Sequence, residues 1–160
     1  MKWISYIWIL CVIALDHLTK QAVLRWMQEG ESISLVAGFF NLCSVRNQGA
    51  AWGILHGQRW ILLVIAALML GLLIQQRREL FNKGWLGKTA FCLLVGGIIG
   101  NVIDRVMWGH VVDFIHVYWH GVFDFPAFNV ADSAICIGAF LYILASFLTQ
   151  RTQSTTQSTQ

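Results

Sequence analysis

Two aspartates in the last third of the chain, Asp113 and Asp132, are the residues of this sequence best placed for acid–base chemistry. Asp113 lies in the apolar run VVDFI with no neighbouring cation, and Asp132 lies in FNVADSAICIG, where another apolar run begins. Two carboxyl groups that converge repel each other, so the pair holds one proton near neutral pH. One can then take a proton from water while the other donates a proton to the attacked carbonyl. Such a pair can cleave an amide without metal, serine or cysteine.

Asparagines accompany the acidic residues at a repeated spacing. Asn129 and Asp132 form an N-x-x-D pattern, which Asn101 and Asp104 repeat. The first pair is typical of a helix start, with Asn129 as N-cap and Asp132 as the acidic member of a capping box. A capping carboxylate stays ionised, so capping is compatible with catalysis. For Asp104, a pair with the adjacent Arg105 that merely ends a helix is favoured over a catalytic role.

A third acidic residue, Asp16, follows the 13-residue apolar run WISYIWILCVIAL. As a helix this run covers roughly 20 Å of a bilayer core about 30 Å thick, so Asp16 should lie in its outer third. Lys20 is one helical turn further on, and an i,i+4 ion pair is expected. Two interpretations stay open: an interfacial pair whose lysine reaches the headgroups, or a pair that shapes a polar site.

The composition indicates which elements must position these residues. Hydrophobic residues make up 57% and charged residues 12% of the 160, whereas soluble domains carry about 25% charged residues. We therefore expect an all-α membrane protein with four transmembrane helices, built as a single domain over residues 1–150. The predicted spans cover about 3–24, 54–74, 88–106 and 130–149, with outer loops at 25–53 and 107–129 and a disordered cytoplasmic tail at 151–160.

The first outer loop contains the segment Ser32 to Val45, SISLVAGFFNLCSV. β-Branched and alternating residues on both sides of Ala37-Gly38 predict a short extracytoplasmic β-hairpin. An open strand edge can pair with an extended peptide. With Trp52 and Trp60 nearby, the hairpin is expected to form a cradle over such a peptide.

The distribution of charge predicts the orientation. The segment between the second and third predicted spans holds Arg77, Arg78, Lys83 and Lys88, which favours a cytoplasmic position for it and for both termini. Of the acidic residues, only Glu79 lies there, so the chemistry is expected near the outer face. The basic residues are spread along the chain, which argues against a nucleic-acid partner.

Five short blocks of the sequence resemble the bacterial lipoprotein signal peptidases (signal peptidase II, aspartic peptidase family A8). The resemblance extends from Asp16 to Gly138, and it departs from the usual residues at His17 and Trp52. In the family's order the blocks are Asp16–Lys20, Asn47–Gly53, Gly100–Arg105, Val112–Ile115 and Phe128–Ser133.

The resemblance implies an endopeptidase of the bacterial cytoplasmic (inner) membrane. It would remove the signal peptide from diacylglyceryl-modified prolipoproteins, cleaving just before the lipidated cysteine. It implies contact with membrane lipids, inhibition by globomycin-type compounds and no cofactor or metal. Nothing in these expectations requires more than a monomer. Asp113 and Asp132 would be the catalytic pair. The substrate-binding and supporting residues would be Asp16, Lys20, Asn47, Gly49, Asn101, Asp104, Arg105, Asn129 and Ala131.

Two functions of other classes remain alternatives on the residues alone. A small transporter would use intramembrane acids as a proton or cation path, but the acids here gather on one side. A metal-dependent membrane enzyme would draw on Asp104 and Asp113 with His110, His116 and His120. The spacings of these residues match no strong ligand signature.

Overall fold

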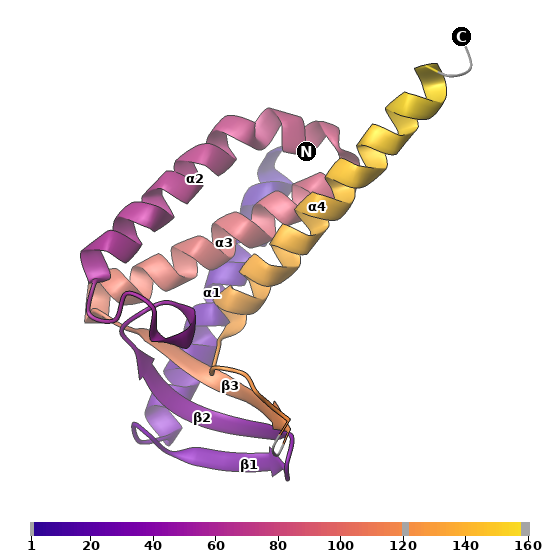
Figure 1. The fold of residues 1–160 in the computed structure, drawn as a ribbon. Helices are drawn as coiled ribbons and strands as arrows, with labels where there is room; N and C mark the ends of the chain where they lie inside the picture. The colour runs from indigo at the N-terminus through magenta and orange to yellow at the C-terminus, as the bar shows by residue number, and fades with distance from the viewer. Residues whose placement is uncertain (1, 120–121, 158–160) are drawn as a thin grey trace.

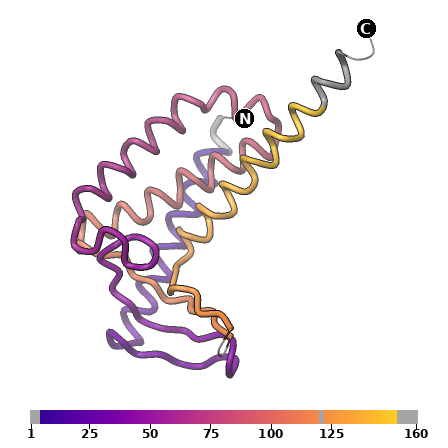
Figure 2. The backbone as a smooth tube through the Cα atoms, viewed as in Figure 1, coloured from indigo at the N-terminus to yellow at the C-terminus, as the bar shows by residue number. Residues whose placement is uncertain are grey.

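The structure is a computed structural model that describes residues 2–119 and 122–157. Figures 1 and 2 show long helices gathered into a bundle with a small antiparallel sheet at one end. Four helices of the described chain are long and apolar enough to cross a membrane, which confirms the predicted fold class. They are α1 (Lys2–Trp26), α2 (Arg59–Asn82), α3 (Gly84–Trp108) and α4 (Val130–Gln157).

Helix α3 forms the centre of the bundle. In the most apolar segment of α3, 61% is buried inside the protein, whereas only 6% of the corresponding segment of α2 is buried. Glycines on α3 allow α1 and α4 to approach closely: a Cβ added at Gly96 would lie 2.8 Å from Cβ of Val12, and one at Gly97 would lie 2.5 Å from the carbonyl oxygen of Ala131. The close contact of α1 and α4 with α3 therefore depends on the absence of side chains at Gly96 and Gly97.

The sheet has the strand order β1-β2-β3-β4, with β1 (Ser32–Val36), β2 (Phe40–Asn47), β3 (Val111–Trp119) and β4 (Phe123–Asp124). The predicted hairpin is confirmed as β1 and β2. β3 and β4 were missed, because residues 107–129 were predicted as a loop. The run VVDFIHVYW carries the β-branched and aromatic residues of a strand, and its first four residues are buried.

The helix ends also differ from the predicted span limits. α2 begins at Arg59 rather than 54, because Leu55 and Gly57 have positive φ and interrupt a helix there. The segment between the second and third spans is mostly helical, since only Lys83 separates α2 from α3. α4 continues over residues 151–157 of the tail predicted to be disordered, and no Gly or Pro follows Gly138 to end it. Residues 158–160 lie outside the described residues.

Candidate active site

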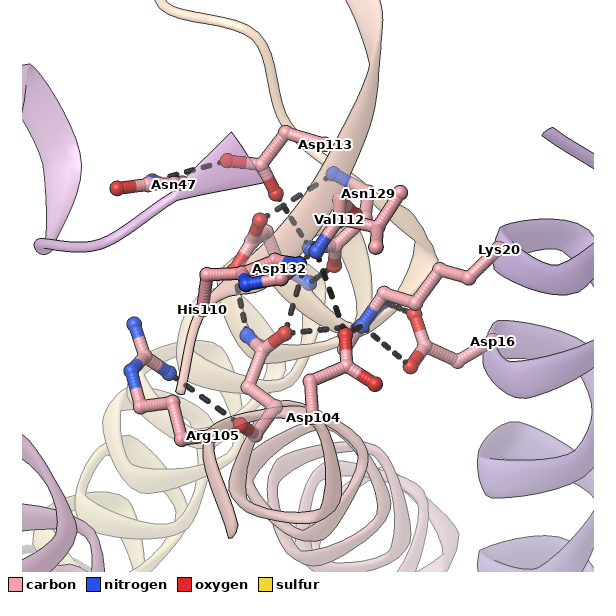
Figure 3. A network of polar contacts seen from close by, with 12 residues as sticks. Asp16, Lys20, Asn47, Asp104, Arg105, His110, Val112, Asp113, Asn129 and Asp132 are labelled. Carbon is pink, nitrogen blue, oxygen red and sulfur yellow. Dashed lines mark hydrogen bonds and ion pairs between the residues drawn. The ribbon is translucent and has the colours of Figure 1, made fainter. Parts of the chain in front are cut away.

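The ends of several elements meet where the bundle joins the sheet (Figure 3). Asp113 lies on β3, whereas Asp132 lies in the first turn of α4. Every sequence-predicted site residue belongs to one connected set of polar contacts at this junction. Helix α1 supplies Asp16 and Lys20; α3 supplies Asn101, Asp104 and Arg105; the end of β2 and the following turn supply Asn47 and Gly49; Asn129 directly precedes α4 and Ala131 lies in its first turn.

Asp113 is buried, with 2% of its surface exposed. Its Oδ1 accepts a hydrogen bond from Nδ2 of Asn129 at 2.7 Å, and its Oδ2 accepts one from Nδ2 of Asn47 at 2.9 Å. Burial, and after it the negative charge of Asp132, raise the pKa of Asp113 to about 7, against the opposing effect of the two amide donors. This carboxyl group can therefore hold a proton near neutral pH.

Asp132 forms the capping box that its sequence predicts. Its backbone N–H donates to Oδ1 of Asn129 at 2.9 Å, and its Oδ2 accepts the backbone N–H of Asn129 at 3.2 Å. Its Oδ1 accepts a third hydrogen bond, from Nδ2 of Asn101 at 2.7 Å. Asn129 thus contacts both aspartates: its Nδ2 donates to Asp113, and its Oδ1 and backbone N–H bond to Asp132 in the capping box.

Lys20 is the central cation of the site. Its Nζ lies 2.7 Å from Oδ2 of Asp16 and 2.9 Å from Oδ2 of Asp104, and it donates to Oδ1 of Asn101 at 3.1 Å. The Asp16–Lys20 pair is therefore present, but Lys20 is 0% exposed, so the interpretation that it reaches the headgroups is wrong. The predicted Asp104–Arg105 pair is also wrong, because Asp104 pairs with Lys20.

The two acids around Lys20 connect it to other elements. Oδ1 of Asp16 accepts the backbone N–H of Ala131 at 2.9 Å, and Oδ2 of Asp104 accepts that of Val112 at 3.4 Å. A Cβ at Gly100 would lie 2.7 Å from Oδ2 of Asp16, so only glycine leaves space for this carboxylate. No local spacing in the sequence indicates that Gly100 faces Asp16 or that the backbone of Val112 contacts Asp104.

Arg105 and Gly49 hold the other side of the pair. Nη2 of Arg105 donates to the carbonyl oxygen of Gly49 at 2.8 Å, and the N–H of Gly49 donates to Oδ1 of Asn47 at 2.9 Å. Because Oδ1 of Asn47 is occupied in this way, its Nδ2 is directed at Asp113. A Cβ at Gly49 would lie 2.8 Å from the carbonyl oxygen of Ile54, which explains the small residue there.

A cavity of about 600 Å³ opens beside the two aspartates. Asp113, Asp132 and Arg105 line its polar end, and apolar side chains of α2, α3 and α4, among them Met69, Ile98 and Ile135, line the remainder. This volume lies within the range of small-molecule sites, about 300–1,000 Å³. The carboxyl groups therefore face a space that can admit an amphipathic ligand.

The residues named for a metal site do not gather. Nε2 of His110 meets Nη1 of Arg46 at 3.2 Å, Nε2 of His116 meets Oδ1 of Asp124 at 2.7 Å, and Asp104 pairs with Lys20. His120 lies outside the described residues. In the remainder, no three histidine, cysteine or acidic side chains are grouped so as to hold a metal ion.

Solved structures with the same architecture define the class of protein. One, described as a bacterial membrane enzyme determined at 2.3 Å resolution, has a TM-score of 0.80 at 37% identity and covers 91% of this chain and 88% of its own. A second, described in the same words at 1.9 Å, has a TM-score of 0.74 at 36% identity, covering 88% and 90%. The chain is a multi-pass membrane enzyme.

Sequence relatives define the family. The protein-family model described as Signal peptidase (SPase) II matches residues 8–148 of this chain. The lipoprotein signal peptidase of Geobacillus thermodenitrificans is 43% identical over 90% of this chain and 89% of its own, and that of Listeria monocytogenes serotype 4a is 39% identical over 91% and 94%. The chain belongs to the signal peptidase II family of aspartic peptidases. This confirms the resemblance and favours a peptidase over the transporter and metal-enzyme alternatives.

Proposed function

We propose that this enzyme removes the signal peptide from diacylglyceryl-modified prolipoproteins by cleaving just before the lipidated cysteine, with Asp113 and Asp132 as the catalytic pair. The names of its relatives support the substrate class. The catalytic assignment rests on the contacts of Asn129. This residue donates a hydrogen bond to Oδ1 of Asp113 and caps the first turn of α4, which contains Asp132. Both carboxyl groups also line the same cavity.

The surroundings of the two aspartates favour different roles. Each aspartate accepts two hydrogen bonds from amide groups, but Asp132 also lies in the first turn of α4, where the helix dipole stabilises a carboxylate. Asp132 is therefore the base that takes a proton from water as its oxygen attacks the carbonyl carbon. Asp113, whose pKa is raised to about 7 by burial, donates its proton to the carbonyl oxygen. When the tetrahedral intermediate collapses, the C–N bond breaks and the carbonyl group forms again. Asp113 takes its proton back, and the proton held by Asp132 passes to the departing amine.

The polar neighbours orient this pair. Lys20 donates to Oδ1 of Asn101, so Nδ2 of Asn101 must face Asp132. On the other side, Gly49 fixes the amide of Asn47 toward Asp113. We assign Lys20 and Gly49 as positioning residues, because each acts through an asparagine. A pair whose geometry is set before the substrate arrives avoids reorganisation during the reaction.

The cavity fits a substrate that is partly lipid. Its apolar walls on α2, α3 and α4 suit a signal helix and acyl chains, while the scissile bond lies at the polar end. Only 6% of the most apolar segment of α2 is buried inside the protein. A substrate can therefore enter from the bilayer beside this helix. The exposed edge strand β1 offers backbone groups to an extended segment of the precursor.

We further propose that both termini are cytoplasmic and that the sheet and the catalytic pair lie at the outer face. Arg77 and Arg78 lie near the end of α2, and Lys83 lies between α2 and α3. The positive-inside rule puts this end of the bundle on the cytoplasmic side. Single cysteines placed in the α2–α3 turn and in the β1–β2 turn of a variant without native cysteines test this. Only the second should react with a membrane-impermeant thiol reagent on intact cells.

A gel-shift assay tests the proposed reaction. The purified full-length enzyme is incubated with a prolipoprotein precursor that carries the diacylglyceryl group and, in parallel, with the same precursor without it. We expect a smaller product from the lipidated precursor alone, with cleavage insensitive to EDTA and blocked by globomycin. Cleavage of both precursors alike would contradict the substrate assignment. Loss of activity in EDTA that added metal restores would contradict the aspartate mechanism.

A further inference from the structure

A second cavity, of about 380 Å³, lies between α1 and α3 in the half of the bundle away from the sheet. Its lining includes Ser5, Trp8 and Val12 of α1 and Trp85, Lys88 and Thr89 of α3. None of these residues belongs to the polar network around Asp113 and Asp132. The proposed peptidase function therefore leaves this cavity without a role.

Lys88 gives this cavity a positive charge. Among the side chains that the structure describes, those of residues 5–119 and 122–151, none forms a hydrogen bond or ion pair with Lys88. Its neighbour Lys83 differs, because Nζ of Lys83 lies 2.7 Å from Oε1 of Glu79 and 3.0 Å from Oγ of Ser146. The ammonium group of Lys88 is thus available to an anion from outside the chain.

The other lining residues place that charge at the level of lipid headgroups. Lys88 is four residues after the start of α3 at Gly84, or roughly 6 Å along the helix axis. Trp8 and Trp85 are exposed, and exposed indoles of membrane proteins concentrate at the interface. The cavity therefore combines a cation and the Thr89 hydroxyl with apolar surface from residues such as Val12 and Leu93, which lies one turn of α3 further on.

We propose that this cavity is a binding site for an anionic phospholipid of the leaflet at the α2–α3 turn. Lys88 and Thr89 contact the phosphate, and one acyl chain lies against α1 and α3 below the two tryptophans. The charge of Lys88 selects an anionic over a zwitterionic headgroup. Basic cavities between transmembrane helices are suited to such lipids, and each basic residue near the surface contributes about 1 kcal/mol of attraction.

The test uses the full-length enzyme in nanodiscs that contain phosphatidylcholine with a small share of phosphatidylglycerol brominated on its acyl chains. Bromine quenches tryptophan fluorescence on contact, so the quenching that Trp85→Phe removes reports occupancy of the cavity. Native mass spectrometry of the released protein counts the phosphatidylglycerol retained. Lys88→Gln is compared with Arg78→Gln, which removes the same charge from the exposed end of α2, outside the cavity.

We expect wild type and Arg78→Gln to retain phosphatidylglycerol in preference to phosphatidylcholine, and Lys88→Gln to lose about fivefold of that preference, the factor that corresponds to about 1 kcal/mol. Equal losses in both variants would overturn the site in favour of general surface charge. Equal quenching by brominated phosphatidylcholine would overturn the headgroup assignment. If mass spectrometry detects dimers of the protein in place of bound lipid, the cavity would belong to an interface with a second copy of the chain. If Lys88→Gln does not fold, Thr89→Val takes its place. Inorganic phosphate should not compete with the lipid, because the site also binds an acyl chain.

Discussion

Two ion pairs of this enzyme have the same spacing and the same length but occupy opposite ends of the bundle. Lys20 and Asp16 on α1 are 2.7 Å apart. Glu79 on α2 and Lys83, which directly follows α2, are also 2.7 Å apart, and both pairs join residues i and i+4. Their surroundings differ, because Asp16 is 1% exposed and Glu79 is 64% exposed. Residue type and spacing alone do not distinguish the two pairs.

The difference lies in the kind of additional partner, because Lys20 has a second acid whereas Lys83 adds only the neutral hydroxyl of Ser146. Lys20 also pairs with Asp104 and donates to Asn101, whose amide contacts Asp132. Charges removed from water cost several kcal/mol each unless such partners compensate them. An exposed pair contributes only about 0–1 kcal/mol. The sheet end of the bundle therefore carries a buried network of charged and amide side chains, whereas the pair at the turn end has an exposed carboxylate and one neutral partner.

The largest effect is expected for the proposed catalytic pair. Asp113→Asn and Asp132→Asn should each reduce processing of a lipidated precursor by about 10²–10⁴-fold, the range for loss of a general acid or base. Each variant keeps the size of the side chain, so the protein should still fold and reach the membrane. Initial rates in the gel-shift assay measure the effect.

Glu79→Gln is the matched control for the turn end, since it removes a carboxylate from an exposed pair. Its processing rate should equal that of the wild type. Wild-type activity in either dyad variant would refute the catalytic assignment. A strong loss in Glu79→Gln would show that the two ends of the bundle are coupled, which the contacts do not predict.

The next effect concerns the two lysines directly. Lys20→Met leaves Asp16 and Asp104 without their cation, and breaking a buried pair costs about 3–5 kcal/mol. Lys83→Met should cost about 1 kcal/mol or less. Thermal unfolding of both variants in the same detergent measures the contrast, and the midpoint of Lys20→Met should fall much further.

A purely structural lysine would change stability alone, whereas a positioning lysine also changes the pH profile. The positive charge of Lys20 lowers the pKa of Asp113. In Lys20→Met that pKa should rise, so Asp113 stays protonated to higher pH and the alkaline limb of the residual activity moves upward. An unchanged profile would leave Lys20 with a role in folding only.

Residues that act through local spacing were predictable from the sequence. The capping box of Asn129 and Asp132, the Asp16–Lys20 pair and the hairpin of β1 and β2 all follow from short-range rules. The gathering of all the named site residues came from resemblance to a family, because no local rule brings α1, α3, β3 and α4 to one point.

Burial and long-range pairing could not be predicted in the same way. The depth of Lys20 depends on Gly100 and on the N-terminus of α4, which are distant in sequence. β3 was missed because its partner β2 lies more than 60 residues earlier, and its first residues are buried without the alternation of a half-exposed strand. Tertiary contacts decided both features.

A glycine comparison tests how closely the buried pair is fitted. A Cβ at Gly100 would lie 2.7 Å from Oδ2 of Asp16, whereas one at Gly71 on α2 would meet nothing within 4 Å. Gly100→Ala should therefore displace Asp16 and cost about 1–3 kcal/mol, as overpacking does. Gly71→Ala should be neutral or slightly stabilising. Thermal unfolding and precursor cleavage measure both, and equal behaviour of the two variants would contradict the tight fit of Asp16 against α3.

The smallest effect sharpens the roles within the pair. Asn47→Ala removes a donor that favours the ionised form of Asp113, so the pKa of Asp113 rises from about 7. A hydrogen bond to a charged group contributes about 1.5 kcal/mol, which corresponds to about one pH unit. If Asp113 is the acid, the alkaline limb of kcat moves up by about this amount. Asn41→Ala, on the same strand, should leave the profile unchanged. Movement of the acidic limb instead would mean that Asp113 acts as the base and that the two roles must be exchanged.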